Sequence, residues 1–599
     1  MAKKIQEIFT REKPDRRLLA NVPDPTEMRK EDRRMGGYHG SGPNITSKRY
    51  LIDARAILRY HDKTRKLIKA EGVILDISLT GMLISFDAQL DLQFGKQVKL
   101  KFKLPPGALP EGFESRVAIK ANVVRFSDID GFQVAFQFSE DLKQYTGKRR
   151  GRISLWMSSL LLFLITLMIL FMRAESIIFY SYNAMLYAYS IITAAFLLSR
   201  YFFGFLYRPE PINLEFKPGV SIIIPCFNEE EMIQRTILSC MNQNYPIDKL
   251  EVIVVDDCSN DHSYDRILEI VDIIKKETRF QTEDRIHCMQ LDKNKGKREA
   301  LIAGTKIAKH EFVTYVDSDS FLQPDAIVNL VQPMQDPLVG GVTGRTDVAN
   351  KYTNMLTRMQ AVRYYIAFRI MKAAESIFDA VTCLSGPISC YRKELIFKYE
   401  DNWLNQKFLG HKATFGDDRS MTNFILREGR TCYQDTAVCA TVVPSQYPQF
   451  IKQQMRWKRS WLRESIIAAK YMWRKEPAMA LSYYMGFLVP VAAPIVVTYN
   501  LMYVPLTQGI FPTTFLTGLL LMALLMSFAN MFFMRSILWL YGLLFCIFYE
   551  VVLLWQMPIA WVTFWKSTWG TRMTPQDLAD AERKKIRRKR TRFMRRRES

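Results

Sequence analysis

Long apolar stretches that alternate with charged segments constrain this chain more than any other feature. Two of them, 153–172 and 176–206, precede a polar middle, and 477–505, 513–534 and 536–562 follow it. A helix needs about 20 predominantly apolar residues to cross a bilayer, so each stretch predicts a membrane-spanning helix. We therefore expect a multi-pass membrane protein whose polar segments lie outside the lipid.

Basic clusters beside these stretches indicate which side of the membrane the polar segments face. The formal net charge is +23, and much of it lies in residues 29–34, 148–152 and 584–597. Lys and Arg are enriched at the cytoplasmic ends of spans, so the segment before residue 153 and, two spans later, the polar middle are predicted to be cytoplasmic. Three further spans would place the basic tail on the non-cytoplasmic side of the membrane, against this preference. We therefore expect the last apolar stretch to bend near Pro558, and we leave the number of C-terminal spans open.

The positions of the basic clusters also indicate what kind of partner they bind. Basic clusters bind nucleic acid or anionic lipid, but clusters that adjoin apolar spans favour the lipid bilayer, and no nucleic-acid partner is predicted. The N-terminus has no apolar core like that of a signal peptide, so insertion is expected to depend on the internal spans. The nine cysteines include no C-x-x-C pair, which argues against a zinc site.

The segment before the first span is expected to form an arm and a small barrel. Residues 1–47 are rich in charge, Pro and Gly and predict a flexible arm. After them, short segments in which apolar and polar residues alternate are separated by turn residues, and this pattern predicts a small β-barrel. The predicted strands lie at 56–58, 72–75, 81–84, 98–102, 117–119 and 133–136.

The polar middle alternates apolar strand-like runs with helical segments. Residues 220–225, 252–257 and 312–316 predict buried strands. Strands that alternate with helices predict a mostly parallel sheet, with ligands at the carboxyl ends of the strands. Residues 446–474 mix Trp, Phe, Arg and Lys, and they predict an amphipathic helix at the membrane interface.

Asp317 and Asp319 directly follow the third of these strands. A nucleotide-sugar diphosphate needs a divalent ion to neutralise its charge and to polarise the leaving group. Carboxylates at alternate positions suit Mg²⁺ or Mn²⁺, although an Asp at a strand end can also cap a turn. We predict that both are metal ligands, because further site motifs follow them in order.

Three more residues are candidates for donor binding. Asp256 and Asp257 end the second strand and suit hydrogen bonds to a nucleobase or ribose, although they could equally begin a loop. Lys297 lies in a Gly-containing turn before a helical run, where its cation and the helix N-terminus could hold the diphosphate. A solvated cluster of charges explains that turn equally well.

A second acidic pair, Asp417 and Asp418, predicts a general base. An acceptor hydroxyl loses its proton as it attacks the anomeric carbon, and a carboxylate must lie within hydrogen-bonding reach of it. One carboxylate can act while the other orients, and we predict that Asp418 is the base.

Gln453, Arg456 and Trp457 combine an amide, a guanidinium and an indole on one predicted helical face. Arg456 can meet the pyrophosphate, and Trp457 can stack on the acceptor sugar. The alternative role of such a tryptophan is that of an interfacial anchor.

Together these motifs resemble a processive family 2 glycosyltransferase, nearest to hyaluronan synthases and close to chitin and cellulose synthases. The resemblance covers residues 218–475, and KSTWGTR at 566–572 resembles a segment after the last spans of that group. The motifs that carry it are VDSDS (316–320), VTCLSGPISCYR (381–392), NWLNQKFLGHKATFGDDRSMTN (402–423) and QQMRW (453–457).

The resemblance implies a GT-A fold, a UDP-sugar donor, Mg²⁺ or Mn²⁺, inversion to a β-linkage and a transmembrane channel for the growing polysaccharide. It also implies that Cys383 and the loop of Ser385, Gly386 and Pro387 border the acceptor. A single displacement with one base agrees with the carboxylate roles predicted above.

A second resemblance concerns the predicted barrel. Asp76, Ser78 and Gly81 lie in a polar turn between two predicted strands. They resemble the D/N-x-S-x-x-G motif of PilZ domains, which implies binding of cyclic di-GMP as an allosteric activator.

That family also places R-x-x-x-R before the first strand, because guanidiniums stack on guanine and grip phosphate. Here Arg49 occupies a suitable place, but Asp53 stands where the second arginine is expected. Arg29 and Arg33 have the right spacing farther upstream. The PilZ fold is therefore expected, and the arginines that bind the dinucleotide stay open.

The predicted fold class is a multi-domain membrane protein with a PilZ-like β-barrel, a cytosolic α/β GT-A glycosyltransferase domain and an α-helical transmembrane region. The expected divisions are 1–47 (flexible basic arm), 48–146 (barrel), 153–207 (two transmembrane helices), 208–445 (transferase), 446–476 (interfacial helix), 477–565 (C-terminal transmembrane helices) and 566–599 (basic cytoplasmic tail).

The predicted function is that of a polysaccharide synthase of the bacterial inner membrane, with periplasmic export subunits as further partners to consider. Two alternatives stay open. One is a non-processive transferase that glycosylates a lipid carrier, and the other is a cyclic di-GMP receptor that uses a degenerate transferase as a scaffold. The sequence does not specify the sugar or the linkage.

Overall fold

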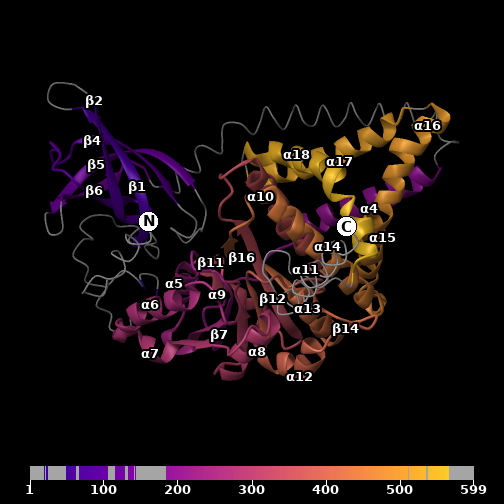
Figure 1. Cartoon of the computed structure of the whole chain (residues 1–599), viewed down its shortest axis with the longest axis horizontal. Coiled ribbons are helices and arrows are strands. Elements are labelled where there is room, and N and C mark those ends of the chain that lie inside the picture. Colours follow the sequence, from indigo (N-terminus) through magenta and orange to yellow (C-terminus); the bar gives the residue numbers. More distant parts are fainter. Residues whose placement is uncertain are drawn as a thin grey trace, which may run out of the picture.

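The computed structural model describes residues 19, 22–23, 49–61, 67–104, 115–127, 132–140, 142, 184–413, 415–509, 511–534 and 537–564. Most of the predicted arm, the predicted span 153–172 and the predicted tail lie outside these residues, as do Arg29 and Arg33. Figure 1 shows a barrel at one end of the molecule, a larger α/β unit, and the C-terminal helices along another side of that unit.

The six predicted barrel strands are all present. They form a closed antiparallel barrel in the order β1-β2-β3-β6-β5-β4, which pairing of β1 with β4 completes. Along β4, Val98, Leu100 and Phe102 are buried while Lys99 and Lys103 are exposed, as expected of strands with one face on a core. The strands are β1 (Arg49–His61), β2 (Leu67–Ser78), β3 (Gly81–Phe86), β4 (Gln97–Leu104), β5 (Ser115–Ser127) and β6 (Phe132–Phe138).

An eight-stranded sheet in the order β11-β16-β12-β13-β10-β7-β8-β9 forms the centre of the α/β unit. β7 and β8 are buried at every position, because helices cover both faces of the parallel part. The strands are β7 (Val220–Cys226), β8 (Leu250–Asp256), β9 (Ile286–Gln290), β10 (Phe312–Tyr315), β11 (Ser320–Leu322), β12 (Val339–Val348), β13 (Ser389–Arg392) and β16 (Arg430–Thr441).

Two apolar clusters cover the opposite faces of this sheet. α5 (Ile233–Met241) and α6 (Ser263–Lys275) contribute to one of them. α8 (Lys297–Ile307) and α12 (Lys393–Leu404) contribute to the other.

The sheet is more mixed than the sequence predicts. The strands expected at 220–225, 252–257 and 312–316 are confirmed as β7, β8 and β10, and these three are parallel. However, β13 runs antiparallel to β10 and β12, and β11 runs antiparallel to β16. The carboxyl ends of the parallel strands still share one edge of the sheet, where the site motifs were expected.

Three helices connect this edge to the C-terminal part of the chain. They are α10 (Met355–Ile366), α13 (Asp417–Glu428) and α14 (Tyr447–Ala469). The helix predicted at 446–474 is confirmed as α14, which packs against α13 and α19 (Gln556–Trp561). Its predicted place at a membrane interface stays a prediction.

Among the described residues, one helical stretch, Pro477–Gln508, is long and apolar enough to cross a membrane. It comprises α15 (Pro477–Thr498), the π-helical η9 (Tyr499–Tyr503) and α16 (Val504–Gln508), and it agrees with the span predicted at 477–505. α17 (Thr513–Met534) has the extent of the next predicted stretch, and α4 (Ala184–Leu206) packs against α15. The multi-pass arrangement stays a prediction.

The last predicted span, 536–562, is not one continuous helix. α18 (Leu540–Phe548) and the π-helical η11 (Tyr549–Leu553) form a short apolar helix that ends at a turn before α19. The break lies before Pro558, which is part of the first turn of α19. The N–H groups of a first turn have no partner within the helix, so the proline is tolerated there and does not itself break the helix. The bend expected near Pro558 is therefore present but begins earlier.

Candidate active site

A cavity of about 1260 Å³ lies at the carboxyl edge of the sheet and extends to the C-terminal helices. Residues beyond β10, the start of α13 and one face of α14 line it, and Pro490, Phe545 and Met557 line it from the C-terminal helices. The structure thus brings most of the predicted site residues into one space. They are Lys297, Asp317, Asp319, Cys383, Ser385, Gly386, Asp417, Asp418, Gln453, Arg456 and Trp457.

Asp317 and Asp319 lie on the short connection between β10 and β11. Asp319 Oδ1 accepts hydrogen bonds from Thr441 Oγ1 at 3.2 Å and from Ser320 Oγ at 3.3 Å. Burial and the neighbouring charge of Asp317 raise the pKa of Asp319 to about 6. This pair of carboxylates therefore concentrates negative charge that a cation would relieve.

The two carboxylates fit a divalent cation by the chemistry of their hard oxygen donors. Mg²⁺ is often held by one or two carboxylates together with substrate phosphates. Among the described residues, no group of three or more His, Cys, Asp or Glu side chains could hold a metal, so a cation here would need phosphate and water as its other ligands. Gly386 keeps the space open, since a Cβ there would lie 2.9 Å from Asp317 Oδ2.

Lys297 is the first residue of α8 and reaches the same carboxylates. Its Nζ donates a hydrogen bond to Asp317 Oδ1. Burial by itself lowers the pKa of Lys297, but the charges of Asp317, Asp417 and Asp418 raise it above its ordinary value. The amine is therefore a cation at the place predicted for the diphosphate.

Asp256 and Asp257 do not line the cavity. Asp256 is fully buried at the end of β8, where it accepts hydrogen bonds from the Ser259 N–H and from Gln290 Nε2, both at 3.0 Å. The predicted contact of this pair with a nucleobase or ribose stays a prediction.

Asp257 instead holds the turn that leads into α8. Its carboxylate accepts the backbone N–H groups of Lys295 and Gly296 at 2.7 and 2.8 Å. Burial raises the pKa of Asp257 to about 6, although these two hydrogen bonds lower it. Asp257 therefore positions Lys297 from behind the cavity wall.

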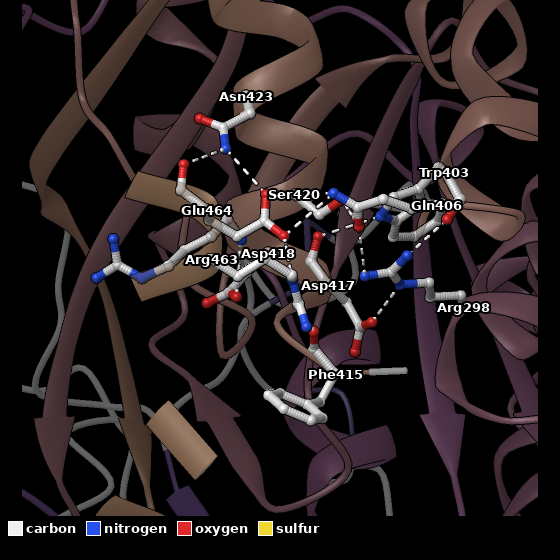
Figure 2. A network of polar contacts seen from close by, with 11 residues as sticks. Arg298, Trp403, Gln406, Phe415, Asp417, Asp418, Ser420, Asn423, Arg463 and Glu464 are labelled. Carbon is white, nitrogen blue, oxygen red and sulfur yellow. Dashed lines mark hydrogen bonds and ion pairs between the residues drawn. The ribbon is translucent and has the colours of Figure 1, made fainter. Parts of the chain in front are cut away.

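Asp417 takes part in a buried network beneath the cavity floor (Figure 2). Arg298 Nε donates to Asp417 Oδ1 at 2.6 Å, and the same guanidinium donates to Trp403 O at 2.5 Å and Gln406 Oε1 at 3.2 Å. Trp403 Nε1 donates in turn to Asp417 O at 3.3 Å. Removing one member of a buried ion pair leaves an uncompensated charge, so Asp417 balances the charge of Arg298. Its predicted role of orienting Asp418 stays a prediction.

The network in Figure 2 continues from α13 to α14. Gln406 Nε2 donates to Glu464 Oε1 at 3.1 Å, and Asn423 Nδ2 donates to Glu464 Oε2 at 3.0 Å. Arg463 Nε donates to Glu464 Oε1 at 2.8 Å. The relative position of the two helices that carry the predicted base and the predicted acceptor site is therefore fixed by buried polar contacts.

Asp418 keeps its carboxylate in the cavity. Oδ1 accepts the Arg419 N–H at 2.8 Å and Oδ2 accepts the Cys383 thiol at 3.3 Å. Unlike Asp417, it forms no ion pair with a described side chain. Gly416, with φ of 81°, starts α13 close to α14, since a Cβ there would lie 1.9 Å from Ser460 Oγ.

The predicted acceptor loop is held by a buried amine that the sequence analysis missed. Lys372 Nζ donates to Cys383 O at 2.7 Å and to Ser385 Oγ. Burial, and then the charge of Asp418, raises the pKa of Cys383 to about 11. Cys383 is therefore a neutral thiol that donates a hydrogen bond to Asp418.

Gln453, Arg456 and Trp457 lie on the face of α14 that lines the cavity. Trp457 is 40% exposed, and its ring centroid is 6.3 Å from that of Tyr364. Gln453 Oε1 is buried without a hydrogen-bond partner among the described residues. An open aromatic face beside an unsatisfied acceptor suits the rings and hydroxyls of a sugar.

The barrel places its predicted motif on the hairpin between β2 and β3. Ser78 Oγ accepts the N–H of Gly81 at 3.1 Å and that of Thr80 at 3.3 Å. Arg49 lies opposite Ser78 in the pairing of β1 with β2, so the first residue of β1 lies beside this turn. Asp76 is buried at the end of β2.

Two models of known families match this chain. Glycosyl transferase family 2 matches residues 221–399, which include Asp317 and Asp319, and the PilZ domain matches residues 44–150. The chain carries a family 2 glycosyltransferase domain and a PilZ domain. The barrel and the sheet are therefore the PilZ domain and the transferase domain.

Similar proteins extend the match beyond the family models. A hyaluronan synthase of Streptococcus pyogenes serotype M3 is 36% identical over 284 residues, which is 47% of this chain and 66% of the relative. An N-acetylglucosaminyltransferase of Mesorhizobium japonicum is 36% identical over 264 residues, 43% of this chain and 59% of the relative. The chain thus spans between 59% and 66% of the length of these two curated relatives.

A mannosyltransferase of Pyrobaculum calidifontis, solved with GDP-Man and Mn²⁺, is a more distant structural neighbour. It has a TM-score of 0.42 and 20% sequence identity, and the match covers 61% of this chain and 98% of that one. This likeness supports no inference about the site.

The residues that sequence reasoning missed are those that hold the transferase site from behind. Lys372 has no motif around it. Arg298 lies in the turn of Lys297, for which diphosphate binding and a solvated cluster of charges were both left open, and both Lys372 and Arg298 are buried. Arg298 stands next to Lys297 at the start of α8. Consecutive side chains on a helix point in different directions. Because Lys297 and Arg298 are consecutive, the sequence could have indicated that only one of them faces the cavity.

Proposed function

We propose that this chain is a processive, membrane-embedded β-glycosyltransferase that polymerises a sugar from a UDP-sugar into an exopolysaccharide. The observation that supports it is the single cavity that extends from Asp317 and Asp319, past Asp418 and Trp457, to residues of the C-terminal helices. Such a site suits an enzyme that both elongates a chain and passes it onward.

The donor end would hold the nucleotide diphosphate. Asp317 and Asp319 would bind Mg²⁺ or Mn²⁺, which neutralises the diphosphate and polarises the bond to the leaving group. Lys297, at the N-terminus of α8, would bind a phosphate oxygen by charge and hydrogen bonding. Arg456 lines the same cavity, close enough to Asp317 for their charges to interact, and would contact the departing UDP.

Asp418 would act as the general base. Its oxygens lie in the cavity, held by the Cys383 thiol and the Arg419 N–H rather than by a cation. It would take the proton of the acceptor hydroxyl as that oxygen bonds to the anomeric carbon and the bond to UDP breaks. One displacement inverts the anomeric centre, so an α-linked donor gives a β-linked product.

The acceptor end would bind the sugar chain. Trp457 would stack on the terminal sugar, and Gln453 Oε1, which lacks a partner among the described residues, would accept a hydroxyl hydrogen bond. Cys383, Ser385 and Gly386 would border the same sugar.

Export of the product through the protein is the next part of the proposal. A second cavity of about 700 Å³ shares Pro490, Phe545 and Tyr549 with the first and is lined by α15, α17 and α18. The shared lining residues place this cavity next to the site, which supports a path for the polymer between the C-terminal helices. The protein would then be a multi-pass protein of the bacterial inner membrane.

We further propose that the PilZ domain binds cyclic di-GMP and activates the transferase. Asp76, Ser78 and Gly81 would form the dinucleotide turn, with Arg49 beside it. Isothermal titration calorimetry on the Arg49→Ala and Asp76→Ala variants tests this, with weakened dinucleotide affinity as the expected result. Unchanged affinity in both variants would remove these residues from the site.

One experiment separates the proposed function from its alternatives. Purified protein would be incubated with a panel of UDP-sugars and GDP-mannuronate, with and without cyclic di-GMP, and the product would be digested with linkage-specific hydrolases. Long polymer on a gel supports the proposal. Single-sugar products on a lipid carrier would favour the non-processive alternative, and no product under any condition would favour the scaffold alternative.

A further inference from the structure

Leu19 and Val22 precede the PilZ barrel in sequence but pack into the transferase domain. Leu19 is 0% exposed and Val22 is 2% exposed. Both belong to the apolar cluster that α5 and α6 form with β7 and β8, and neither belongs to the core of the barrel. We call Leu19, Val22 and the following Pro23 the N-terminal anchor.

The geometry of the N-terminal anchor is that of a turn inserted into a surface. The Val22 N–H donates to Leu19 O at 3.2 Å, which directs the two apolar side chains to the same site. Pro23, which follows Val22, is exposed. Burial of a Leu and a Val removes apolar area from water, so the contact stabilises the folded state.

Two helices that contribute to the same apolar cluster, α5 and α6, begin at the mouth of the cavity. α5 follows directly after Asn228 to Met232, and α6 follows after Asn260 and Asp261, and these residues line the cavity. The two loops are joined because Asn228 Oδ1 accepts the Asn260 N–H at 2.8 Å.

A second pair of contacts ties the loops to α6 itself. Ser263 Oγ accepts the Glu229 N–H at 2.7 Å, and Glu230 Oε2 accepts the His262 N–H at 3.2 Å. A shift of α5 or α6 would therefore move the loops at the donor end of the cavity, because packed elements transmit displacements through their contacts.

We propose that the α5/α6 surface is a docking site for the N-terminal anchor, and that this contact couples the PilZ domain to the donor end of the cavity. The occupant is a segment of this chain, and β1 begins later on the same N-terminal segment, at Arg49. Ligand binding at the barrel would act through the anchor on α5 and α6, and thus on the KM for the donor more than on kcat. The coupling, though not the docking, rests on the proposed function.

The test compares the full-length Leu19→Ser/Val22→Ser variant with a Leu67→Ser control, because Leu67 is 57% exposed on the barrel. Donor KM and kcat would be measured with and without cyclic di-GMP, and dinucleotide binding would be measured by calorimetry. We expect the activation ratio to fall at least about fivefold through a higher donor KM, a loss of about one kcal/mol of coupling, with dinucleotide affinity unchanged. Activation like that of the control would overturn the coupling.

Hydrogen exchange of the backbone amides of 228–232 and 260–263 provides a readout that does not depend on catalysis. Faster exchange in Leu19→Ser/Val22→Ser than in Leu67→Ser is expected, and equal exchange would overturn the docking itself. If no donor gives product with the unsubstituted protein, the proposed function fails, while this measurement still decides the docking. If the double variant aggregates, Leu19→Ala is measured in the same way.

Discussion

The two ends of the catalytic cavity hold their polar groups in different ways. At the donor end, Lys297 pairs with Asp317, and Arg298 pairs with Asp417 beneath the floor. At the proposed acceptor end, Gln453 Oε1 has no hydrogen-bond partner within the part of the chain that the structure describes, and Trp457 is 40% exposed. The donor end is thus preorganised by charge, whereas the acceptor end offers an aromatic face and an amide.

This difference agrees with what each end would have to do. A nucleotide diphosphate carries the same charge in every cycle, and preorganised charges stabilise it without reorganisation. A growing chain must move on by one sugar after each transfer, so its contacts must be exchangeable. Substitutions at the donor end should therefore abolish turnover, while substitutions at the acceptor end should change how far the chain grows.

The largest effect is expected from Asp418→Asn. Removal of the general base should lower polymer synthesis by about 10²–10⁴-fold, because the acceptor hydroxyl then has no group to take its proton. Incorporation of radiolabelled sugar measures the rate, and Asp401→Asn on the exposed end of α12 is the matched control. Near-normal turnover in Asp418→Asn would refute this role.

Asp319→Ala should have the next largest effect. Loss of one metal ligand should lower synthesis by about 100-fold or more, since charge stabilisation by a bound metal is worth several kcal/mol and each 1.4 kcal/mol is about tenfold. Chelation with EDTA should inactivate the unsubstituted protein, and excess Mn²⁺ should restore it but not the variant. Activity that survives chelation would contradict a metal at this position. Asp272→Ala, at an exposed position of α6, is the control.

Local sequence patterns predicted the parts of this site that depend on one strand end or one helix. Asp317 and Asp319 follow a buried strand, so their place at the sheet edge follows from strand geometry alone. The alternation of apolar residues likewise predicted every strand of the barrel. These features depend on residues that are neighbours in sequence.

The features that the sequence could not predict depend on contacts between distant residues. Arg298 and Asp417 are 119 positions apart, and no local pattern indicates that they form a buried pair. This pair gives Asp417 different surroundings from those of Asp418. The break between η11 and α19 begins before the bend that was predicted near Pro558, and its position could not be predicted because hydropathy is continuous across it. Tertiary packing determines both the buried pair and the position of the break. Contacts between residues this far apart in the chain leave no local pattern in a single sequence.

A smaller effect, confined to the acceptor end, is expected from Trp457→Ala. Aromatic contacts contribute about 0.5–1.5 kcal/mol, so the chain should dissociate about 2- to 10-fold more readily. Product length on a gel should shorten while donor KM stays unchanged. Trp473→Ala is the control, because Trp473 is 61% exposed and lies in η8 (Met472–Arg474), the short 3₁₀ helix that follows α14. An unchanged length distribution would show that Trp457 does not retain the chain.

The smallest effect would distinguish the two ends by pH, through Asp257. Burial raises the pKa of this carboxyl to about 6, above its ordinary value, so the folded state binds the proton more tightly than the unfolded state does. The stability that this residue contributes is then fully present below its unfolded pKa and is lost as pH rises through about 6. Function has the opposite dependence, because the ionised carboxylate holds the N–H groups of Lys295 and Gly296.

Protonation of Asp257 should therefore loosen the turn that positions Lys297. A hydrogen bond to a charged group is stronger than a neutral one by about 1 kcal/mol, so kcat/KM for the donor should fall about fivefold as pH drops from 7 to 5. In Asp257→Asn the side chain cannot ionise, so the part of the pH profile that belongs to Asp257 should disappear, while the part that belongs to Asp319, whose pKa is also about 6, should remain. Product length should stay constant over the same range, since neither Trp457 nor Gln453 titrates there. If the product became shorter as the rate fell, the donor and acceptor ends would not act independently of each other.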